Sequence, residues 1–121
     1  MTLNSAGLMA FLPSSDLDRA RAFYEGVLGL TVSGTNPAAV VFGRLRVTLA
    51  GAFTPQPFTV FGWEVTDLHA DLARLRNQGV TFLRYDGLEQ DDDGVWTAPN
   101  GDRIAWFHDP DHNVLSLAQL A

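Results

Sequence analysis

One short pattern opens two predicted helices in this chain. Ser15-Asp16-Leu17 precedes a stripe of apolar residues at helical spacing, and Thr66-Asp67-Leu68 opens a second stripe 51 positions later. Ser, Thr and Asp side chains cap helix N-termini, and apolar residues three and four positions apart form one helical face. A glycine follows each stripe, at Gly29 and Gly79, where a helix can end. The repeat therefore predicts two copies of one structural unit.

Apolar runs of strand length surround both predicted helices in the same order. They lie at 8–12, 30–33, 40–42 and 45–50 in the first copy, and at 58–65, 80–84, 103–108 and 114–118 in the second. A segment with two prolines and a glycine, 51–57, separates the copies. The sequence therefore predicts two β-α-β-β-β modules, the repeats 8–50 and 58–118.

This order of elements predicts an α+β fold with one helix per module. A sheet of about four strands with a single helix leaves its other face uncovered. We therefore expect the two modules to form a curved mixed sheet around a cavity. The length of 121 residues is that of one domain, so residues 1–121 are expected to form a single domain.

The charge and the missing residue types exclude several functions. The net charge is −6 and every basic residue is an arginine, so the basic surface that nucleic acid needs is missing. An anionic membrane surface is disfavoured for the same reason, and no apolar run approaches the roughly 20 residues of a membrane helix. Without lysine, no side chain can form a Schiff base. Without cysteine there are no disulfides, thiolate metal sites or thiol nucleophiles, which fits a cytoplasmic location.

A tight turn is predicted at 109–113, where Asp-Pro-Asp-His-Asn separates two apolar runs. This ending resembles that of the vicinal oxygen chelate superfamily, the group of glyoxalases, bleomycin-resistance proteins and extradiol dioxygenases. Chains of that superfamily close with Asp-Pro-Asp-Gly-Asn and then an apolar strand that carries a glutamate. Here His112 stands at the glycine position, where it can take a left-handed conformation at some cost, and Ser116 stands at the glutamate position.

The resemblance implies where a metal ion would be held in the superfamily's enzymes. Their ligands are His, Glu or Gln on the first, fourth, fifth and eighth strands. The matching positions here are Met9, a position near Thr48, Val60 and Ser116. Valine offers no donor atom, a thioether suits copper(I), and neutral hydroxyls do not replace imidazole or carboxylate. We therefore expect no metal ion at these positions and no other cofactor.

The remaining candidate metal ligands have simpler interpretations. Two histidines and two aspartates at 108–112 gather at the predicted turn, and we interpret them as turn polarity. The acidic run Asp-Asp-Asp-Gly at 91–94 lacks the alternating ligands and the distal glutamate of a calcium loop, so we interpret it as a solvated loop. His69 lies in the first turn of the second predicted helix and is expected to be exposed.

Alternation along the predicted strands indicates which side chains face the cavity. The orientation of strand 103–108 stays open, so Trp106 is a candidate, and Trp96 lies beside a loop where it could act as a lid. The predicted cavity is mainly apolar and aromatic, which is typical of a small-molecule site. The candidate ligand-binding residues are Met9, Phe11, Arg46, Thr48, Val60, Glu64, Trp96, Trp106 and Ser116.

Two charged residues among these candidates allow more than one role. Glu64 in an apolar cavity could act as a catalytic base, and Arg46 could hold a carboxylate or phosphate of a ligand. The alternative is that the two side chains pair with each other, or that both lie in water at the rim.

Three functions are open on the sequence alone. The first is a metal-free protein that binds an apolar or aromatic small molecule, similar to the bleomycin-resistance branch, and the acidic net charge suits a cationic ligand. The second is a metal-dependent lyase, isomerase or dioxygenase of the glyoxalase type, against which the missing ligands argue. The third is a metal-free enzyme that uses Glu64 as its base. The resemblance and an apolar rim also predict a homodimer.

Overall fold

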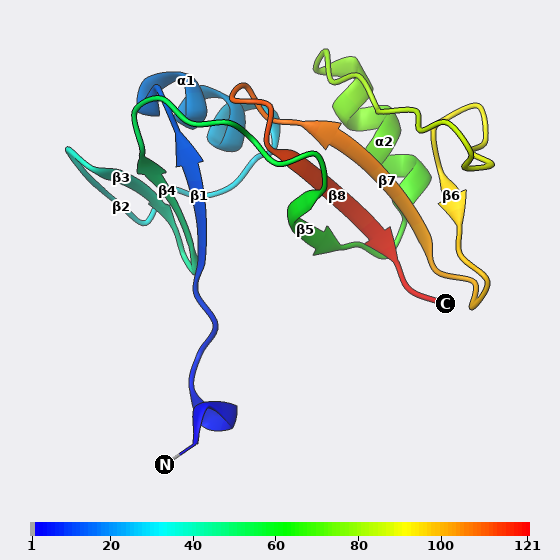
Figure 1. Ribbon diagram of the computed structural model, residues 1–121, viewed down its shortest axis with the longest axis horizontal. Coiled ribbons are helices and arrows are strands. Elements are labelled where there is room, and N and C mark those ends of the chain that lie inside the picture. The colour runs from blue at the N-terminus through cyan, green and yellow to red at the C-terminus, as the bar shows by residue number, and fades with distance from the viewer. Residues whose placement is uncertain (1) are drawn as a thin grey trace. The chain divides into compact units, whose positions relative to one another are not determined.

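A computed structural model describes residues 2–121, which form two compact units. The first unit ends at Phe53 and the second is Thr54–Ala121. Each unit contains one four-stranded sheet and one main helical segment (Figure 1). The predicted α+β fold of two β-α-β-β-β modules is confirmed.

The first unit builds its sheet in the order β1-β4-β3-β2. Strand β1 pairs with β4 in parallel, and the other two pairings are antiparallel. A short 3-10 turn, η1, precedes β1, and a helix with a widened π-type second half, α1 and η2, follows it. The elements are η1 (Leu3–Ser5), β1 (Ala10–Ser14), α1 (Leu17–Arg21), η2 (Ala22–Val27), β2 (Gly34–Asn36), β3 (Ala39–Phe42) and β4 (Leu45–Leu49).

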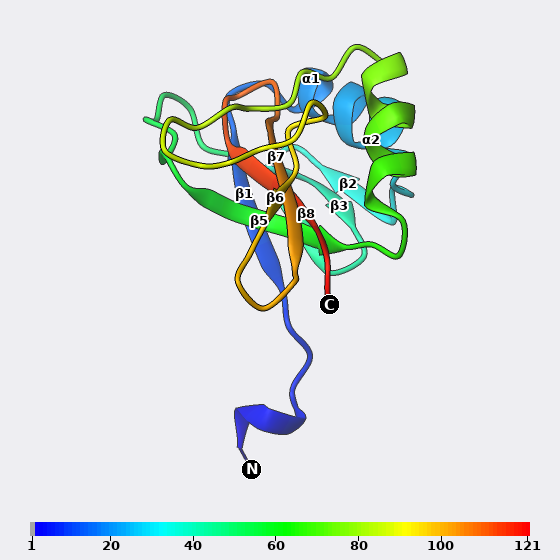
Figure 2. The same ribbon diagram turned by 90° about the vertical axis from the view of Figure 1, so that its right-hand side faces the viewer.

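The second unit repeats this topology with the order β5-β8-β7-β6. Strand β5 pairs with β8 in parallel, and β8–β7 and β7–β6 are antiparallel. Helix α2 lies beside the sheet and contacts β8 (Figure 2). The elements are β5 (Thr59–Glu64), α2 (Leu68–Asn77), β6 (Trp96–Thr97), β7 (Arg103–His108) and β8 (Val114–Gln119).

The repeated helix start works in the same way in both units. The Asp16 side chain accepts a hydrogen bond from the backbone N–H of Arg19 at 3.1 Å. Asp67, 51 positions later, accepts one from the N–H of Ala70 at 3.2 Å. These bonds satisfy donors that the first turn of a helix leaves unpaired. No helix among the described residues is long and apolar enough to cross a membrane.

The apolar stripe of each helix is buried in its own unit. Ala20 and Tyr24 are buried in the first unit, and the Tyr24 ring lies 5.9 Å from that of Phe42. Three leucines of α2 are buried in the second unit, together with Phe107, Leu115 and Leu117 of its sheet. The leucines are Leu68, Leu72 and Leu75.

Two predicted strands are displaced in the structure. The predicted strand 30–33 is shifted along the chain, and the observed strand is β2 at 34–36. The N–H of Ser33, just before β2, also bonds to the carbonyl of Val41 at 2.8 Å. The predicted strand 80–84 is reduced to one bridge between Phe82 and Phe107, and β6 takes its place as the edge strand. The reason is local, because the Gln90 side chain takes up hydrogen bonds of this segment that a sheet partner would otherwise make.

The turn before β8 has the predicted chemistry. One oxygen of Asp109 accepts hydrogen bonds from the N–H groups of Asp111, at 3.0 Å, and Asn113, at 2.8 Å. Its other oxygen accepts from the Asn113 side-chain amide at 2.9 Å. His112 has φ +66°, and it is the one non-glycine residue of 2–121 in the left-handed region. The Asp109 carboxylate is therefore a structural part of the turn, in agreement with the interpretation as turn polarity.

Candidate ligand-binding faces

Each sheet has a face that its helix does not cover, here called its open face. In the first unit, Leu12 and Val47 are fully buried on the helix side. Their neighbours along the strands point the other way, since side chains alternate. The register pairs Phe11 with Arg46, and Pro13 with Thr48. Three of the candidates, Phe11, Arg46 and Thr48, therefore share the open face of the first sheet.

Side chains on this first open face range from half-buried, as in Arg46 and Thr48, to exposed. Phe11 is 62% exposed, and Met9, just before β1, is 49% exposed. The Thr48 hydroxyl donates to the backbone carbonyl of Leu12 at 3.4 Å. Exposed apolar side chains next to a cation and a hydroxyl form a surface that can take part in ligand binding.

The open face of the second sheet is defined by two rows of paired residues. The first row runs from Gly62 through Ser116 to Trp106. The second row runs from Glu64 through Ala118 and Ile104 to Trp96. The register thus settles the orientation of Trp106, which the sequence left open. It lies on the same face as Ser116.

Ser116 and Gly62 are in close contact on this face. A Cβ atom placed on Gly62 would lie 2.5 Å from Ser116 Oγ and 2.7 Å from its carbonyl oxygen. Only glycine therefore fits under the Ser116 side chain without a shift of the strands. Val60 lies at an irregularity of β5, between Thr59 and Phe61, and is 38% exposed.

Three aromatic rings form the most distinctive group on the second open face, here called the aromatic group: Tyr85, Trp96 and Trp106. The rings of Tyr85 and Trp106 are perpendicular, with centroids 5.3 Å apart. Those of Trp96 and Trp106 are inclined by 33°, with centroids 6.3 Å apart. All three are partly exposed. Burial raises the pKa of the Tyr85 phenol, so its hydroxyl stays neutral and can donate a hydrogen bond.

A single amide, that of Gln90, positions two rings of the aromatic group. Its oxygen accepts from the N–H of Tyr85 at 2.7 Å, and its nitrogen donates to the carbonyls of Leu83 and Gly94 at 2.9 and 2.8 Å. The Gln90 backbone also bridges to that of Trp96. The loop thus carries Tyr85 and Trp96 on a framework of hydrogen bonds.

Glu64 lies on the same face as the aromatic group. Its side chain is exposed, and it makes no hydrogen bond or ion pair within the second unit, residues 54–121. An exposed carboxylate of this kind is available to a cationic group of a ligand. Its role as a catalytic base stays a prediction.

The donors at the four positions matched to the superfamily's metal ligands do not fit a divalent cation. The Thr48 hydroxyl hydrogen points to a backbone carbonyl, and the Ser116 hydroxyl lies against Gly62. Met9 offers a soft thioether and Val60 offers no donor. No carboxylate or imidazole stands at any of the four positions, so the charge of a divalent ion would stay uncompensated.

Two surface hollows lie away from the candidate residues. One of about 400 Å³ in the first unit is lined by parts of α1, β2 and β4, including Asp18, Arg21 and Asn36. One of about 220 Å³ in the second unit is lined by Arg76, Phe82 and neighbouring residues. Neither hollow contains any of the nine candidate ligand-binding residues.

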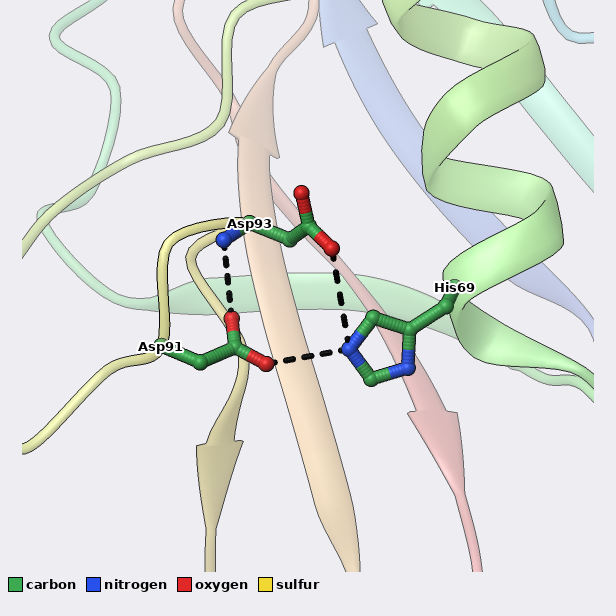
Figure 3. A group of neighbouring side chains, drawn as sticks. All are labelled: His69, Asp91 and Asp93. Atoms are coloured by element: carbon green, nitrogen blue, oxygen red, sulfur yellow. Dashed lines mark hydrogen bonds and ion pairs between the residues drawn. The ribbon is translucent and has the colours of Figure 1, made fainter.

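The sequence did not predict that three polar residues of the second unit lie together. His69 and the acidic loop meet in the structure, and the His69 imidazole faces the carboxylates of Asp91 and Asp93 (Figure 3). Tyr85 and Gln90 were also missed. Residues of this kind lie far apart in the sequence or carry no periodic pattern, so the sequence gives no signal that they meet.

A sequence model of the family described as Glyoxalase/Bleomycin resistance protein/Dioxygenase superfamily matches residues 6–117. The chain belongs to this superfamily. No curated protein matches the chain significantly.

Solved structures of the superfamily fold resemble this chain over nearly its whole length. An antibiotic-binding protein, TnmS3 from Streptomyces sp. CB03234, is 26% identical, with 100% of each chain covered and a TM-score of 0.70. Lactoylglutathione lyase from Agrobacterium tumefaciens is 22% identical, with 95% of this chain and 93% of that chain covered and a TM-score of 0.70. A glyoxalase/bleomycin resistance protein/dioxygenase from Alicyclobacillus acidocaldarius is 21% identical, with 99% and 95% covered and a TM-score of 0.70.

Proposed function

We propose that this protein binds a small molecule with an aromatic or apolar part, and that no metal ion takes part in the binding. The observation that carries the proposal is the aromatic group on the open face of the second sheet, the face that also carries Glu64 on β5 at the opposite edge. Partly exposed aromatic rings offer flat faces and edges against which a planar ligand packs. The similarity to an antibiotic-binding protein supports the same function.

The charges favour a cationic ligand over an anionic one. The chain carries a net charge of −6, and the carboxylate of Glu64 is exposed on the same face as the aromatic group. Aromatic faces attract cations, and a carboxylate on the same face adds a longer-range attraction. On the first open face, Phe11 and Met9 offer apolar surface and Arg46 offers a polar group.

The proposal is tested by tryptophan fluorescence during titration with aromatic antibiotics, each compared with an uncharged analogue. We expect saturable quenching, with tighter binding of the cationic compounds. Trp106→Leu should weaken binding by about 2- to 12-fold, which corresponds to the roughly 0.5–1.5 kcal/mol of an aromatic pair. The matched control is Trp63→Phe, because Trp63 points to the other side of β5.

The competing function is that of a metal-dependent lyase, isomerase or dioxygenase of the glyoxalase type. The donors at the matched positions argue against it, since none is an imidazole or a carboxylate. Turnover of lactoylglutathione, the compound in one neighbour's name, that depends on an added divalent metal would favour the enzyme. Turnover that persists in a chelator but is lost in Glu64→Gln would favour a metal-free enzyme.

We further propose that residues 1–121 act as one domain in a cytoplasmic homodimer. Several apolar side chains are exposed on the single chain, and burial of such surface favours association. Leu8 is 88% exposed and Phe58 59% exposed, in addition to Phe11. Light scattering should give about twice the 13.2 kDa of one chain, and a mass of a single chain would contradict the dimer.

A further inference from the structure

Two segments that lie apart in the sequence meet at the start of helix α2. His69 stands in the first turn of the helix, and Asp91 and Asp93 stand in the loop before β6. The His69 Nε2 atom lies 3.0 Å from Asp91 Oδ2 and 3.8 Å from Asp93 Oδ2 (Figure 3). One donor atom from each residue lies within 4.8 Å of the others. The three side chains thus converge on one point.

The Asp91 carboxylate is held in place by the loop itself. Its Oδ1 atom accepts hydrogen bonds from the N–H groups of Asp93 and Val95, each at 2.9 Å. Its Oδ2 atom is left to face His69.

The Asp93 carboxylate is held by an arginine. Arg76 Nη1 lies 3.3 Å from Asp93 Oδ1, and Arg76 Nη2 donates to the Asp93 carbonyl at 3.1 Å. The guanidinium also lies 5.5 Å above the ring centre of Phe82, which fixes it further. Both aspartates thus use one oxygen for structure and turn the other towards His69 (Figure 3).

The two donor distances from His69 lie near those in a site for a small divalent cation. Zinc bonds of about 2.0–2.2 Å in a tetrahedral site place neighbouring donor atoms about 3.3–3.6 Å apart. The two distances from His69, 3.0 and 3.8 Å, lie on either side of that range. The two carboxylates together compensate the double positive charge of the ion. The positive charge of Arg76, which is paired with Asp93, reduces that compensation. The side chains are 40–46% exposed, so an ion can enter and water can complete its coordination.

We propose that His69, Asp91 and Asp93 form a binding site for a first-row divalent cation, best suited to Zn²⁺. The imidazole selects zinc and its neighbours over calcium and magnesium, which prefer six or more oxygen ligands. The site is separate from the four positions matched to the superfamily's metal ligands, and it does not depend on the proposed ligand-binding function. The ion replaces the hydrogen bond between His69 and Asp91 and links α2 to the loop.

The loop connects this site to the aromatic group. The N–H of Asp91 bonds to the Val95 carbonyl at 2.9 Å, and Trp96 follows directly. A cation at the site stabilises the folded state, because the unfolded chain does not bring the three ligands together. It also restrains the segment that carries Trp96, so its binding should change the tryptophan fluorescence.

The test is isothermal titration calorimetry of the chelator-treated full chain with zinc chloride, alongside magnesium and calcium chloride. We expect one Zn²⁺ per chain, a raised melting temperature on saturation, and no comparable binding of Mg²⁺ or Ca²⁺. His69→Gln and Asp91→Asn should each weaken zinc binding at least 10-fold. Asn at position 91 can still accept the loop hydrogen bonds, so this variant separates loss of a ligand from loss of the fold.

The matched control is His108→Gln, which removes the histidine whose ring lies 5.2 Å from that of His112 in the other histidine-containing group. Zinc binding by this variant should equal that of the unaltered chain. Three results would overturn the proposal: no saturable zinc binding, equal binding by a folded His69→Gln, or loss of binding in His108→Gln.

Discussion

Replacement of Gln90 by alanine tests whether one side-chain amide holds the loop that carries the aromatic group. The amide makes three hydrogen bonds, to the N–H of Tyr85 and to the carbonyls of Leu83 and Gly94. A protein hydrogen bond contributes about 0.5–1.5 kcal/mol net, so three contribute about 1.5–4.5 kcal/mol. Gln90 is only partly buried and water replaces some of these bonds. We therefore expect a loss of about 1.5–3 kcal/mol.

The assay is urea unfolding followed by tryptophan fluorescence and by circular dichroism. Gln90→Ala should lower the midpoint, and it should also weaken aromatic-ligand binding because Tyr85 and Trp96 lose their support. Gln90→Glu should restore part of the stability, since a carboxylate still accepts from the N–H of Tyr85 but cannot donate.

The control is Gln78→Ala, at the exposed end of α2, where no side-chain hydrogen bond is lost. Its free energy of unfolding should stay within about 0.5 kcal/mol of the unaltered chain. If Gln90→Ala is equally neutral, the amide does not hold the loop and the reasoning about the aromatic group fails.

Three further substitutions test local features of the fold. Gly62→Ala should cost about 1–3 kcal/mol in urea unfolding because its Cβ meets Ser116, whereas Gly26→Ala, with open space around it, should not destabilise. Partial desolvation and the neighbouring His112 lower the pKa of His108 in the folded state. As the pH drops below about 6.5, His108 therefore takes up a proton in the unfolded chain before it does so in the folded one, and the free energy of unfolding falls. His108→Gln should flatten that part of the pH profile of unfolding. His112→Gly should raise the melting temperature by relieving about 1 kcal/mol of left-handed strain, and an unchanged value would contradict this.

The features that the sequence predicted well are local and repeated. Two helices start where Asp16 and Asp67 accept hydrogen bonds from backbone N–H groups three residues later. The left-handed turn at His112 is likewise set by residues close to it in the sequence. Such bonds depend on residues a few positions apart, so the order of residues is enough to place them.

The features that failed depend on contacts that no repeating pattern in the sequence contains. The predicted strand 80–84 keeps only one bridge, Phe82 to Phe107, because the Gln90 side chain binds the Leu83 carbonyl that a sheet partner would otherwise take. The orientation of Trp106 depends on its register with Ser116, which no pattern within β7 contains. The meeting of His69 with Asp91 spans 22 positions and has no periodic signal.

The predictions about the candidate site are not all supported to the same extent by the structure. Strand alternation predicts which candidates share a face of a sheet. The observed strand registers put Phe11, Arg46 and Thr48 on one face and Glu64, Trp106 and Ser116 on another. Their roles in ligand binding, the cavity and the dimer stay predictions. The mismatch at the four metal positions is a matter of residue chemistry, so it is already visible in the sequence.

The most direct test of the account is ligand calorimetry on folded His69→Gln in the presence of a chelator, with metal analysis of the same sample. This variant lacks one ligand of the proposed zinc site and the chelator removes weakly held metal, so any stoichiometric metal would lie elsewhere. The account predicts saturable binding of an aromatic cation with the affinity of the unaltered chain and no stoichiometric metal. Binding that disappears with the chelator and returns with added zinc, nickel, manganese or iron would contradict it.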